Sequence, residues 1–246
     1  MKDDLQLALE LADISDAITL HSFRKSFSVR TKADHTPVSE VDEEVERAIR
    51  DRLNRQRPDD SIIGEEFGKR GDSARRWIID PIDGTKNYIR GIPIFATLIA
   101  LDGEVGVVSA PALHRRWWAS RGKGAICDGH PIHASQIKNL ADAQIGYDSV
   151  TDFEAVGLGE KFLALMRRCG RARGYGDFWI HMLVAEGAIE VAVEPQVAWW
   201  DMAAVQIIVE EAGGRFTTLD GRPRADGGSA ISSNGLLHKE VMAALR

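Results

Sequence analysis

The sequence has little cysteine, no long apolar run and no excess of basic residues. It holds only two cysteines, Cys127 and Cys169, among 246 residues, too few for a disulfide framework and without CxxC spacing. The longest apolar run, residues 92–101, contains Pro93 and Thr97 and has the length of a strand, so it predicts no membrane span. These absences favour a reducing compartment, and we expect a cytoplasmic protein.

Acidic residues outnumber basic ones. Asp and Glu count 37 against 31 Lys and Arg, which gives a formal net charge of −6. Because nucleic-acid-binding domains usually carry a basic surface, we expect neither nucleic acid nor membrane as a partner. The first twenty residues hold five acidic side chains and no uninterrupted apolar core, which argues against a secretory signal.

Hydrophobic spacing predicts two helices near the start of the chain. One apolar face recurs at intervals of four, three and four residues, marked by Leu7, Leu11, Ile14 and Ile18. A capping-box pattern at Ser39 predicts the start of the second helix.

Short apolar runs bounded by turn residues then predict strands, including an antiparallel meander over residues 105–127. Beyond about residue 135, strands alternate with helices, which favours layered α/β packing. We expect an N-terminal α+β half, 1–137, with most of the metal ligands. A C-terminal α/β half, 138–246, is expected to pack with it as one body.

The segment 77–88, WIIDPIDGTKNY, carries two carboxylates at the end of a predicted strand. Three apolar residues lead to Asp80, Pro81 is expected to stop the strand, and Asp83 follows three positions later. Mg²⁺ takes oxygen ligands, usually one or two carboxylates with water and substrate phosphate. Asp80, the Ile82 carbonyl and Asp83 are therefore candidate metal ligands, although an ordinary Asp-Pro and Asp-Gly turn is the alternative.

Gly84 and Thr85 follow these carboxylates and are expected to open a helix. Exposed N–H groups at a helix start bind phosphate, and a glycine lets the backbone approach it closely. Both residues are candidate phosphate ligands.

Two further segments offer carboxylates after or before a predicted element. Glu65 and Glu66 follow a short strand, where adjacent side chains point opposite ways. We choose Glu65 as a metal ligand that orients water alongside Thr85; a solvated acidic turn is the alternative. Asp201 stands at a helix start behind two tryptophans, where it suits a metal ligand and equally an N-cap residue.

The segment 32–42 precedes the second helix and contains Lys32, Asp34, Thr36 and Asp42. Lys32 is a candidate for steadying a loop near phosphate, and Asp42 for holding a weakly bound ion through water. A capped and solvated helix start is the alternative for both.

Together these motifs resemble the inositol monophosphatase superfamily of magnesium-dependent, lithium-sensitive phosphatases. The resemblance is carried by Glu65-Glu66, by DPIDGT at 80–85, and by Trp200-Asp201 followed by EEAGG at 210–214. It implies a layered αβαβα sandwich of the inositol monophosphatase and fructose-1,6-bisphosphatase type, and a homodimer.

The resemblance also implies a mechanism, which is direct hydrolysis without a phosphoenzyme. Two or three Mg²⁺ ions are expected, with Mn²⁺ as a substitute and inhibition by Li⁺. The implied catalytic residues are Glu65, Thr85 and Asp83. The implied metal ligands are Glu65, Asp80, the Ile82 carbonyl, Asp83, Asp201 and, more weakly, Asp42.

Within the superfamily the chain looks closest to the actinobacterial-type histidinol-phosphate phosphatases. In the segment GYGDFWIHMLVAEGAIEVAVEP, Gly176-Asp177-Phe178-Trp179 stands where inositol phosphatases usually carry a small Gly-Ser/Thr-Ala run. Histidinol bears an ammonium and an imidazole, which carboxylates and aromatic faces suit. The expected substrate-binding residues are Asp177, Glu194, Asp83 and Asp201.

Two other functions stay open. A general inositol or sugar monophosphatase would use the same metal ligands, and sugar-phosphate relatives also place an acidic residue at Glu194. A non-catalytic regulatory or RNA-associated protein could keep the fold, since fold does not determine function. Carboxylates at every expected ligand position argue against that reading.

Overall fold

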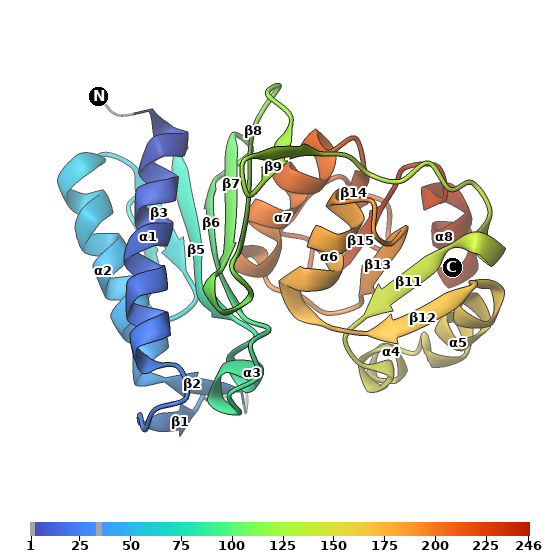
Figure 1. Cartoon of the computed structure of the whole chain (residues 1–246), viewed down its shortest axis with the longest axis horizontal. Coiled ribbons are helices and arrows are strands. Elements are labelled where there is room, and N and C mark those ends of the chain that lie inside the picture. Colours follow the sequence, from blue (N-terminus) through green and yellow to red (C-terminus); the bar gives the residue numbers. More distant parts are fainter. Residues whose placement is uncertain (1–2, 33–35) are drawn as a thin grey trace.

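The computed structural model of the chain describes residues 3–32 and 36–246 (Figure 1). Within these ranges it has eight α-helices: α1 (Asp4–Ser22), α2 (Glu40–Gln56), α3 (Thr85–Ile89), α4 (Val150–Ala155), α5 (Gly159–Arg168), α6 (Asp177–Ala185), α7 (Trp199–Glu211) and α8 (His238–Leu245). Two short 3₁₀ turns lie at Pro111–Leu113 and Leu140–Asp142. None of the described helices is long and apolar enough to cross a membrane.

The larger sheet has eight strands in the order β10-β9-β8-β7-β6-β5-β3-β4. Its neighbours are antiparallel except β3 and β5, which run parallel. The strands are β3 (Ser61–Gly64), β4 (Gly68–Arg70), β5 (Arg76–Asp83), β6 (Ala96–Leu101), β7 (Val105–Ala110), β8 (Arg115–Ser120), β9 (Ala125–Cys127) and β10 (His130–Ile132). The expected antiparallel meander is confirmed as β7, β8 and β9.

The second sheet has five strands in the order β12-β11-β13-β15-β14. Strands β12, β11 and β13 are parallel, and β15 pairs antiparallel with β13 and β14. The strands are β11 (Gln144–Tyr147), β12 (Arg171–Gly174), β13 (Val191–Glu194), β14 (Arg215–Thr217) and β15 (Ala230–Ser233). A two-stranded ribbon of β1 (Val29–Thr31) and β2 (Pro37–Ser39) precedes α2.

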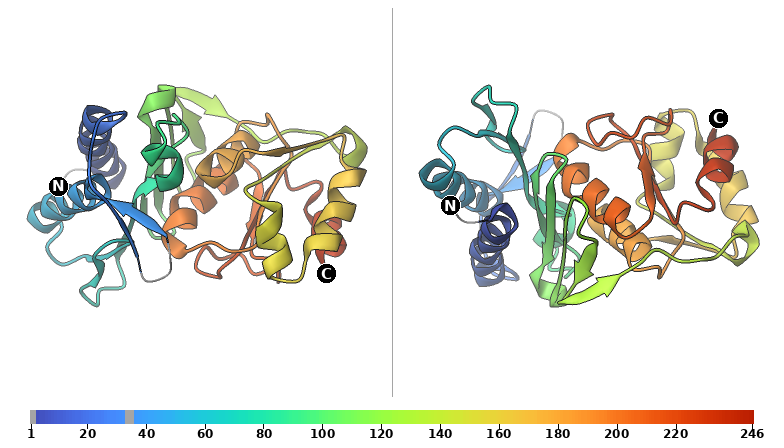
Figure 2. Two further views of the ribbon diagram at one scale, coloured as in Figure 1. Left: turned by 90° about the horizontal axis from the view of Figure 1, so that it is seen from below. Right: turned by 90° about the horizontal axis from the view of Figure 1, so that it is seen from above.

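Helices and sheets alternate in five layers. Helices α1 and α2 cover one face of the larger sheet, and α7 packs against β5, β6, β7 and β8 on the other. Helices α6 and α7 also contact the second sheet, whose far face carries α4, α5 and α8 (Figures 1 and 2). This order confirms the expected αβαβα sandwich. The larger sheet ends at Ile132 and the second begins at Gln144; the division at residues 137 and 138 stays a prediction.

The buried face of α1 differs from the predicted stripe. Leu7 and Leu11 are fully buried, but Ser15 and Thr19 are buried where Ile14 and Ile18 remain half-exposed. Polar partners explain the difference: the Ser15 hydroxyl is hydrogen-bonded to that of Thr97 on β6. Ile18 still packs against the cluster that contains Leu7 and Leu11. The predicted stripe was incomplete in this turn, because buried hydroxyl groups carry no hydrophobic signal.

Pro81 does not end its strand, contrary to the prediction. Strand β5 continues to Asp83, and its register against β6 shifts between Asp80 and Asp83. A proline lacks the N–H that a regular ladder requires and is accommodated at such irregularities. The Pro81 carbonyl accepts a 2.7 Å hydrogen bond from the Thr97 hydroxyl. The irregularity brings Asp80 and Asp83 to the same end of the sheet.

Candidate active site

The site lies where parallel strands of both sheets end. Glu65 directly follows β3, and Asp80 and Asp83 lie at the end of β5, which is parallel to β3. Asp148 follows β11, and Glu194 ends the parallel strand β13. The carboxyl ends of parallel strands share one edge of a sheet, and ligands of α/β proteins bind beyond that edge.

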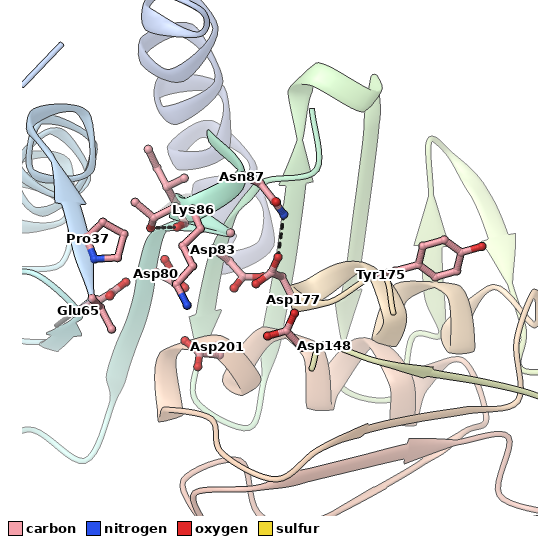
Figure 3. Close-up of a pocket in the computed structure, with 14 residues that line it drawn as sticks. Pro37, Glu65, Asp80, Asp83, Lys86, Asn87, Asp148, Tyr175, Asp177 and Asp201 are labelled. Atoms are coloured by element: carbon pink, nitrogen blue, oxygen red, sulfur yellow. Dashed lines mark hydrogen bonds between the residues drawn. The ribbon is translucent and has the colours of Figure 1, made fainter. Parts of the chain in front are cut away.

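A cavity of about 250 Å³ opens between these strand ends. Its wall combines six carboxylates with one lysine, Lys86 (Figure 3). The remaining lining residues are uncharged. The full set is Thr36, Pro37, Glu65, Asp80, Ile82, Asp83, Gly84, Thr85, Lys86, Asn87, Asp148, Tyr175, Asp177 and Asp201. Such an excess of negative charge calls for bound cations.

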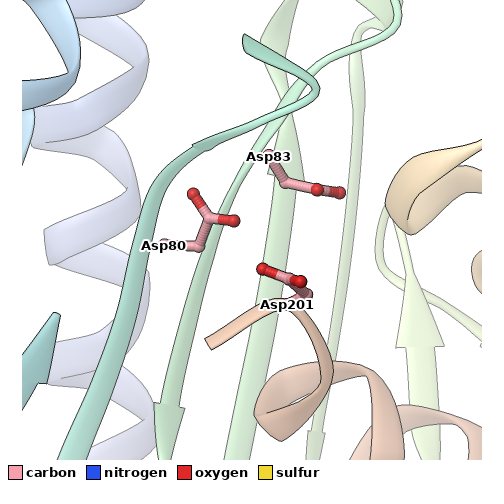
Figure 4. Close-up of side chains that lie close together, drawn as sticks. All are labelled: Asp80, Asp83 and Asp201. Atoms are coloured by element: carbon pink, nitrogen blue, oxygen red, sulfur yellow. The ribbon is translucent and has the colours of Figure 1, made fainter. Parts of the chain in front are cut away.

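Asp80, Asp83 and Asp201 form the centre of the site. Each offers one carboxylate oxygen, and these three atoms lie within 4.8 Å of one another. The side chains converge from β5 and from the first turn of α7 (Figure 4). Asp80 Oδ1 is buried and has no hydrogen-bond partner in the described part of the chain. A hard divalent cation fits this set, because it prefers oxygen ligands and would satisfy the orphaned atom.

Burial makes these carboxylates hard to ionise without a cation. Burial and repulsion from Glu65 raise the pKa of Asp80 well above its usual value. Burial and repulsion from Asp177 do the same to the pKa of Asp83. For Asp201, burial outweighs the hydrogen bond from the Ala198 N–H and raises the pKa to about 7. A bound cation would offset these costs by favouring the ionised forms.

Asp201 is the third residue of α7, not its N-cap. The helix begins at Trp199 after Ala198, and Asp201 Oδ2 accepts a 2.7 Å hydrogen bond from the Ala198 N–H. A carboxylate at this position reaches back to the free N–H at the helix start. The N-cap alternative is therefore wrong, and the backbone contact orients Asp201 toward the cavity.

Gly84 and Thr85 begin α3, as expected. Gly84 precedes the helix with φ +80°, and a Cβ there would lie 2.9 Å from the Ile94 carbonyl oxygen. Thr85 Oγ1 lies 2.9 Å from the Ile82 carbonyl oxygen and 3.2 Å from Asp42 Oδ1. These contacts bring Asp42, although it does not line the cavity, within one hydrogen bond of a lining residue.

Asp42 closes a capping box at the start of α2. Its Oδ2 accepts hydrogen bonds from the N–H and the hydroxyl of Ser39, at 2.8 and 2.5 Å. This confirms the predicted helix start. Burial raises the pKa of Asp42 to about 6. The capping contacts account for Asp42, and its role toward a water-bridged ion stays a prediction.

Lys32 contacts both glutamates that follow β3. Its Nζ donates 2.7 Å hydrogen bonds to Glu65 Oε1 and Glu66 Oε1. Glu65 lines the cavity, and Lys32 lies behind it. Contact of Lys32 with phosphate therefore stays a prediction. The contact that the structure shows instead orients Glu65. Asp34 lies outside the described residues.

Asp177 and Glu194 belong to the half of the site farther from Glu65. Asp177 begins α6 at φ +51°, and its Oδ2 accepts a 3.0 Å hydrogen bond from the Asn87 amide. Burial and repulsion from Asp148 raise the pKa of Asp177 to about 8. Glu194 is 7% exposed and lies behind the lining residues, with Oε2 2.8 Å from His181 Nε2.

Sequence reasoning missed three lining residues in this half: Asn87, Asp148 and Tyr175. Asp148 ends the run Ile145-Gly146-Tyr147-Asp148, in which a strand leads to an aspartate as it does at Asp80. That signal was available, but it is weak alone because aspartate is common in turns. Figure 3 shows Asp148 below Asp177 and to the right of Asp201, with Tyr175 farther to the right.

The sequence profile of the Inositol monophosphatase family matches residues 1–246. The chain belongs to this family. A histidinol-phosphatase of Streptomyces coelicolor is 51% identical, over 99% of this chain and 97% of the relative. The Mycobacterium tuberculosis histidinol-phosphatase is 50% identical over 99% of this chain and 98% of its own.

Among solved structures, a Thermotoga maritima IMPase superposes with a TM-score of 0.89 at 32% identity. The superposition covers 99% of this chain and 97% of the Thermotoga maritima chain. Inositol monophosphatase family members depend on metal, in agreement with the acidic cluster at Asp80, Asp83 and Asp201. The expected family and fold are thus confirmed.

Proposed function

We propose that this protein is a magnesium-dependent histidinol-phosphate phosphatase, which converts L-histidinol phosphate and water to L-histidinol and phosphate. The observation that carries the proposal is the full-length identity of about 50% to two histidinol-phosphatases. The cavity supports it, because Asp148 and Asp177 place two carboxyl groups with raised pKa beyond the metal cluster, and a cationic substrate would favour their ionised forms.

The residues divide into two sets along the cavity. Glu65, Asp80, the Ile82 carbonyl, Asp83 and Asp201 would hold Mg²⁺, with Asp42 behind Thr85. Bound Mg²⁺ would neutralise the phosphate and lower the pKa of the attacking water. Gly84 and Thr85 would contact the phosphate through the start of α3, and Glu65 and the Thr85 hydroxyl oxygen would accept hydrogen bonds from the water and so orient it.

The organic part of the substrate would lie toward Asp177, Tyr175 and Asp148. Carboxylates there would accept charge-assisted hydrogen bonds from the ammonium and the imidazole, and the Tyr175 ring offers an aromatic face. The Asn87 amide, by donating to Asp177, would leave the other carboxylate oxygen for the substrate.

Turnover of three substrates tests the proposal. Phosphate release is measured for histidinol phosphate, inositol 1-phosphate and fructose 1,6-bisphosphate at equal Mg²⁺ and again with chelator. We expect the highest kcat/KM for histidinol phosphate and none without metal. A higher value for inositol phosphate would make the protein an inositol monophosphatase, and no release from any of the three would favour a non-catalytic protein. Light scattering tests the expected homodimer.

A further inference from the structure

Helix α6 carries a fully buried histidine one turn after Asp177. His181 is 0% exposed, and both of its ring nitrogens have partners. Nε2 lies 2.8 Å from Glu194 Oε2, and Nδ1 lies 2.7 Å from the Ser232 hydroxyl on β15. A histidine completely enclosed by protein costs desolvation energy, which an apolar residue of similar size would avoid. The presence of a histidine at this buried position therefore indicates a role for its two hydrogen bonds.

The direction of these hydrogen bonds determines what His181 does. Burial raises the pKa of Glu194 well above its usual value, and a cationic substrate would favour its ionised form. Because an ionised carboxylate only accepts, Nε2 then donates its proton to Glu194, and Nδ1 accepts from the Ser232 hydroxyl. Burial lowers the pKa of His181 to about 3, which keeps the ring neutral. Ser232 is itself fully buried. With Glu194 ionised, the chain Ser232, His181, Glu194 has one consistent set of donors and acceptors.

Glu194 has one oxygen engaged and one available. Oε2 is bonded to His181, whereas Oε1 has no hydrogen bond within the described residues. The side chain is 9% exposed and lies behind the lining residues, at the strand edge from which Asp148 reaches the cavity. Helix α6 therefore places Asp177 in the cavity wall and His181 against Glu194.

We propose that His181 is a positioning residue for substrate selection, which holds Glu194 Oε2 from behind and so directs Oε1 toward the organic part of the substrate. This inference rests on the proposed function. A glutamate already held in one rotamer loses less conformational freedom when the substrate binds. Loss of the contact should therefore weaken substrate selection more than it slows the chemistry.

The test compares His181→Leu, which removes both hydrogen bonds, with His181→Gln, which restores an N–H donor toward Glu194. KM and kcat are measured with Mg²⁺ for histidinol phosphate and for glycerol phosphate. In His181→Leu, we expect the ratio of kcat/KM between the two substrates to fall by about tenfold, through KM. His181→Gln should recover most of this ratio.

His238→Leu is the matched control. His238, the first residue of α8, is also 0% exposed and bonded to a serine of β15, Ser233, but its other ring nitrogen is bonded to the Thr217 hydroxyl and not to a carboxylate. We expect His238→Leu to lower the unfolding temperature without changing the ratio of kcat/KM between the two substrates. Equal losses on both substrates in His181→Leu, or the same change of ratio in His238→Leu, would overturn the inference.

A double-mutant cycle with Glu194→Gln measures the coupling directly. We expect His181→Leu to change KM far less in the Glu194→Gln background; additive effects would contradict a role through Glu194. If His181→Leu does not fold, Ser232→Ala replaces it in the cycle. If the wild-type enzyme prefers inositol 1-phosphate, the proposed function fails, but the same cycle on that substrate still decides whether His181 acts through Glu194.

Discussion

The backbone N–H of Phe178 donates a 2.6 Å hydrogen bond to Asp83 Oδ2. Phe178 lies in the first turn of α6, beside the second sheet, and Asp83 ends β5 in the larger sheet. This buried contact joins the central helix layer to the larger sheet at the site itself. The acceptor geometry of Asp83 is thus set partly by the position of α6, which also carries Asp177.

Asp83→Asn should abolish magnesium-dependent phosphate release. The amide removes the negative charge but keeps an oxygen that can accept from Phe178, so we expect the fold to survive. Because loss of even an outer partner of a metal ligand costs about 10- to 100-fold, we expect kcat/KM to fall by more than about 100-fold. Phosphate release over a Mg²⁺ titration and the unfolding temperature measure the two effects.

Asp72→Asn is the control for that variant, since Asp72 is a surface aspartate whose side chain is 96% exposed. Its activity should equal that of the wild type. Full activity in Asp83→Asn would contradict the assignment of Asp83 to the metal cluster.

Asp177→Asn should weaken the binding of histidinol phosphate more than that of glycerol phosphate. Asparagine tolerates the positive φ at this position, whereas alanine would add backbone strain. A hydrogen bond to a charged group is worth about 1.5–3 kcal/mol, so we expect KM for histidinol phosphate to rise at least about tenfold. Steady-state kinetics on both substrates measure the difference, and an equal loss on both would remove Asp177 from the substrate pocket.

Gly84→Ala should impair both stability and activity. The added Cβ would lie 2.9 Å from the Ile94 carbonyl oxygen and 3.2 Å from Asp177 Oδ2, at φ +80°. An unfavourable backbone conformation alone lowers the free energy of unfolding by about 1–3 kcal/mol. Gly103→Ala is matched in φ, at +73°, but its Cβ would meet nothing within 4 Å. Thermal unfolding of both variants separates strain from contact, and equal activities would contradict the tight approach at Gly84.

His238 should make stability depend on pH below neutrality. Burial, with a smaller contribution from Arg215, lowers its pKa from 6.5 to about 4. The unfolded state then binds more protons than the folded state between these values, so the contribution is present above about pH 6.5 and is lost as pH falls toward 4. Between pH 6.5 and 4, the free energy of unfolding falls through this histidine by at most about 3 kcal/mol.

Urea unfolding of the wild type and His238→Gln at several pH values between 4 and 7 tests this. The stability advantage of the wild type should shrink as the pH falls. An advantage that is constant over this range would show that His238 does not titrate as a buried neutral ring.

Much of the chemistry could be read from local sequence. The order strand, Asp80, Pro81, Ile82, Asp83 and then glycine places two carboxylates at one strand end whatever the rest of the chain does. The capping pattern at Ser39 is equally local, because all its hydrogen bonds lie within four residues. These local features predicted Asp80, Asp83 and the start of α2, and the family and fold were predicted only when Glu65-Glu66 and Trp200-Asp201 were taken with them.

The tertiary structure decided which distant groups share the cavity. Asp148 and Tyr175 reach it because β11 and β12 run parallel and end at one edge, and His181 meets Glu194 because α6 packs against β13. Local sequence could not show this, because strand direction, register and layer packing depend on contacts between residues far apart in the chain. The sequence by itself determined the oxygen-rich strand end at Asp80 and Asp83; the packing of the second sheet decided the shape and charge of the rest of the cavity.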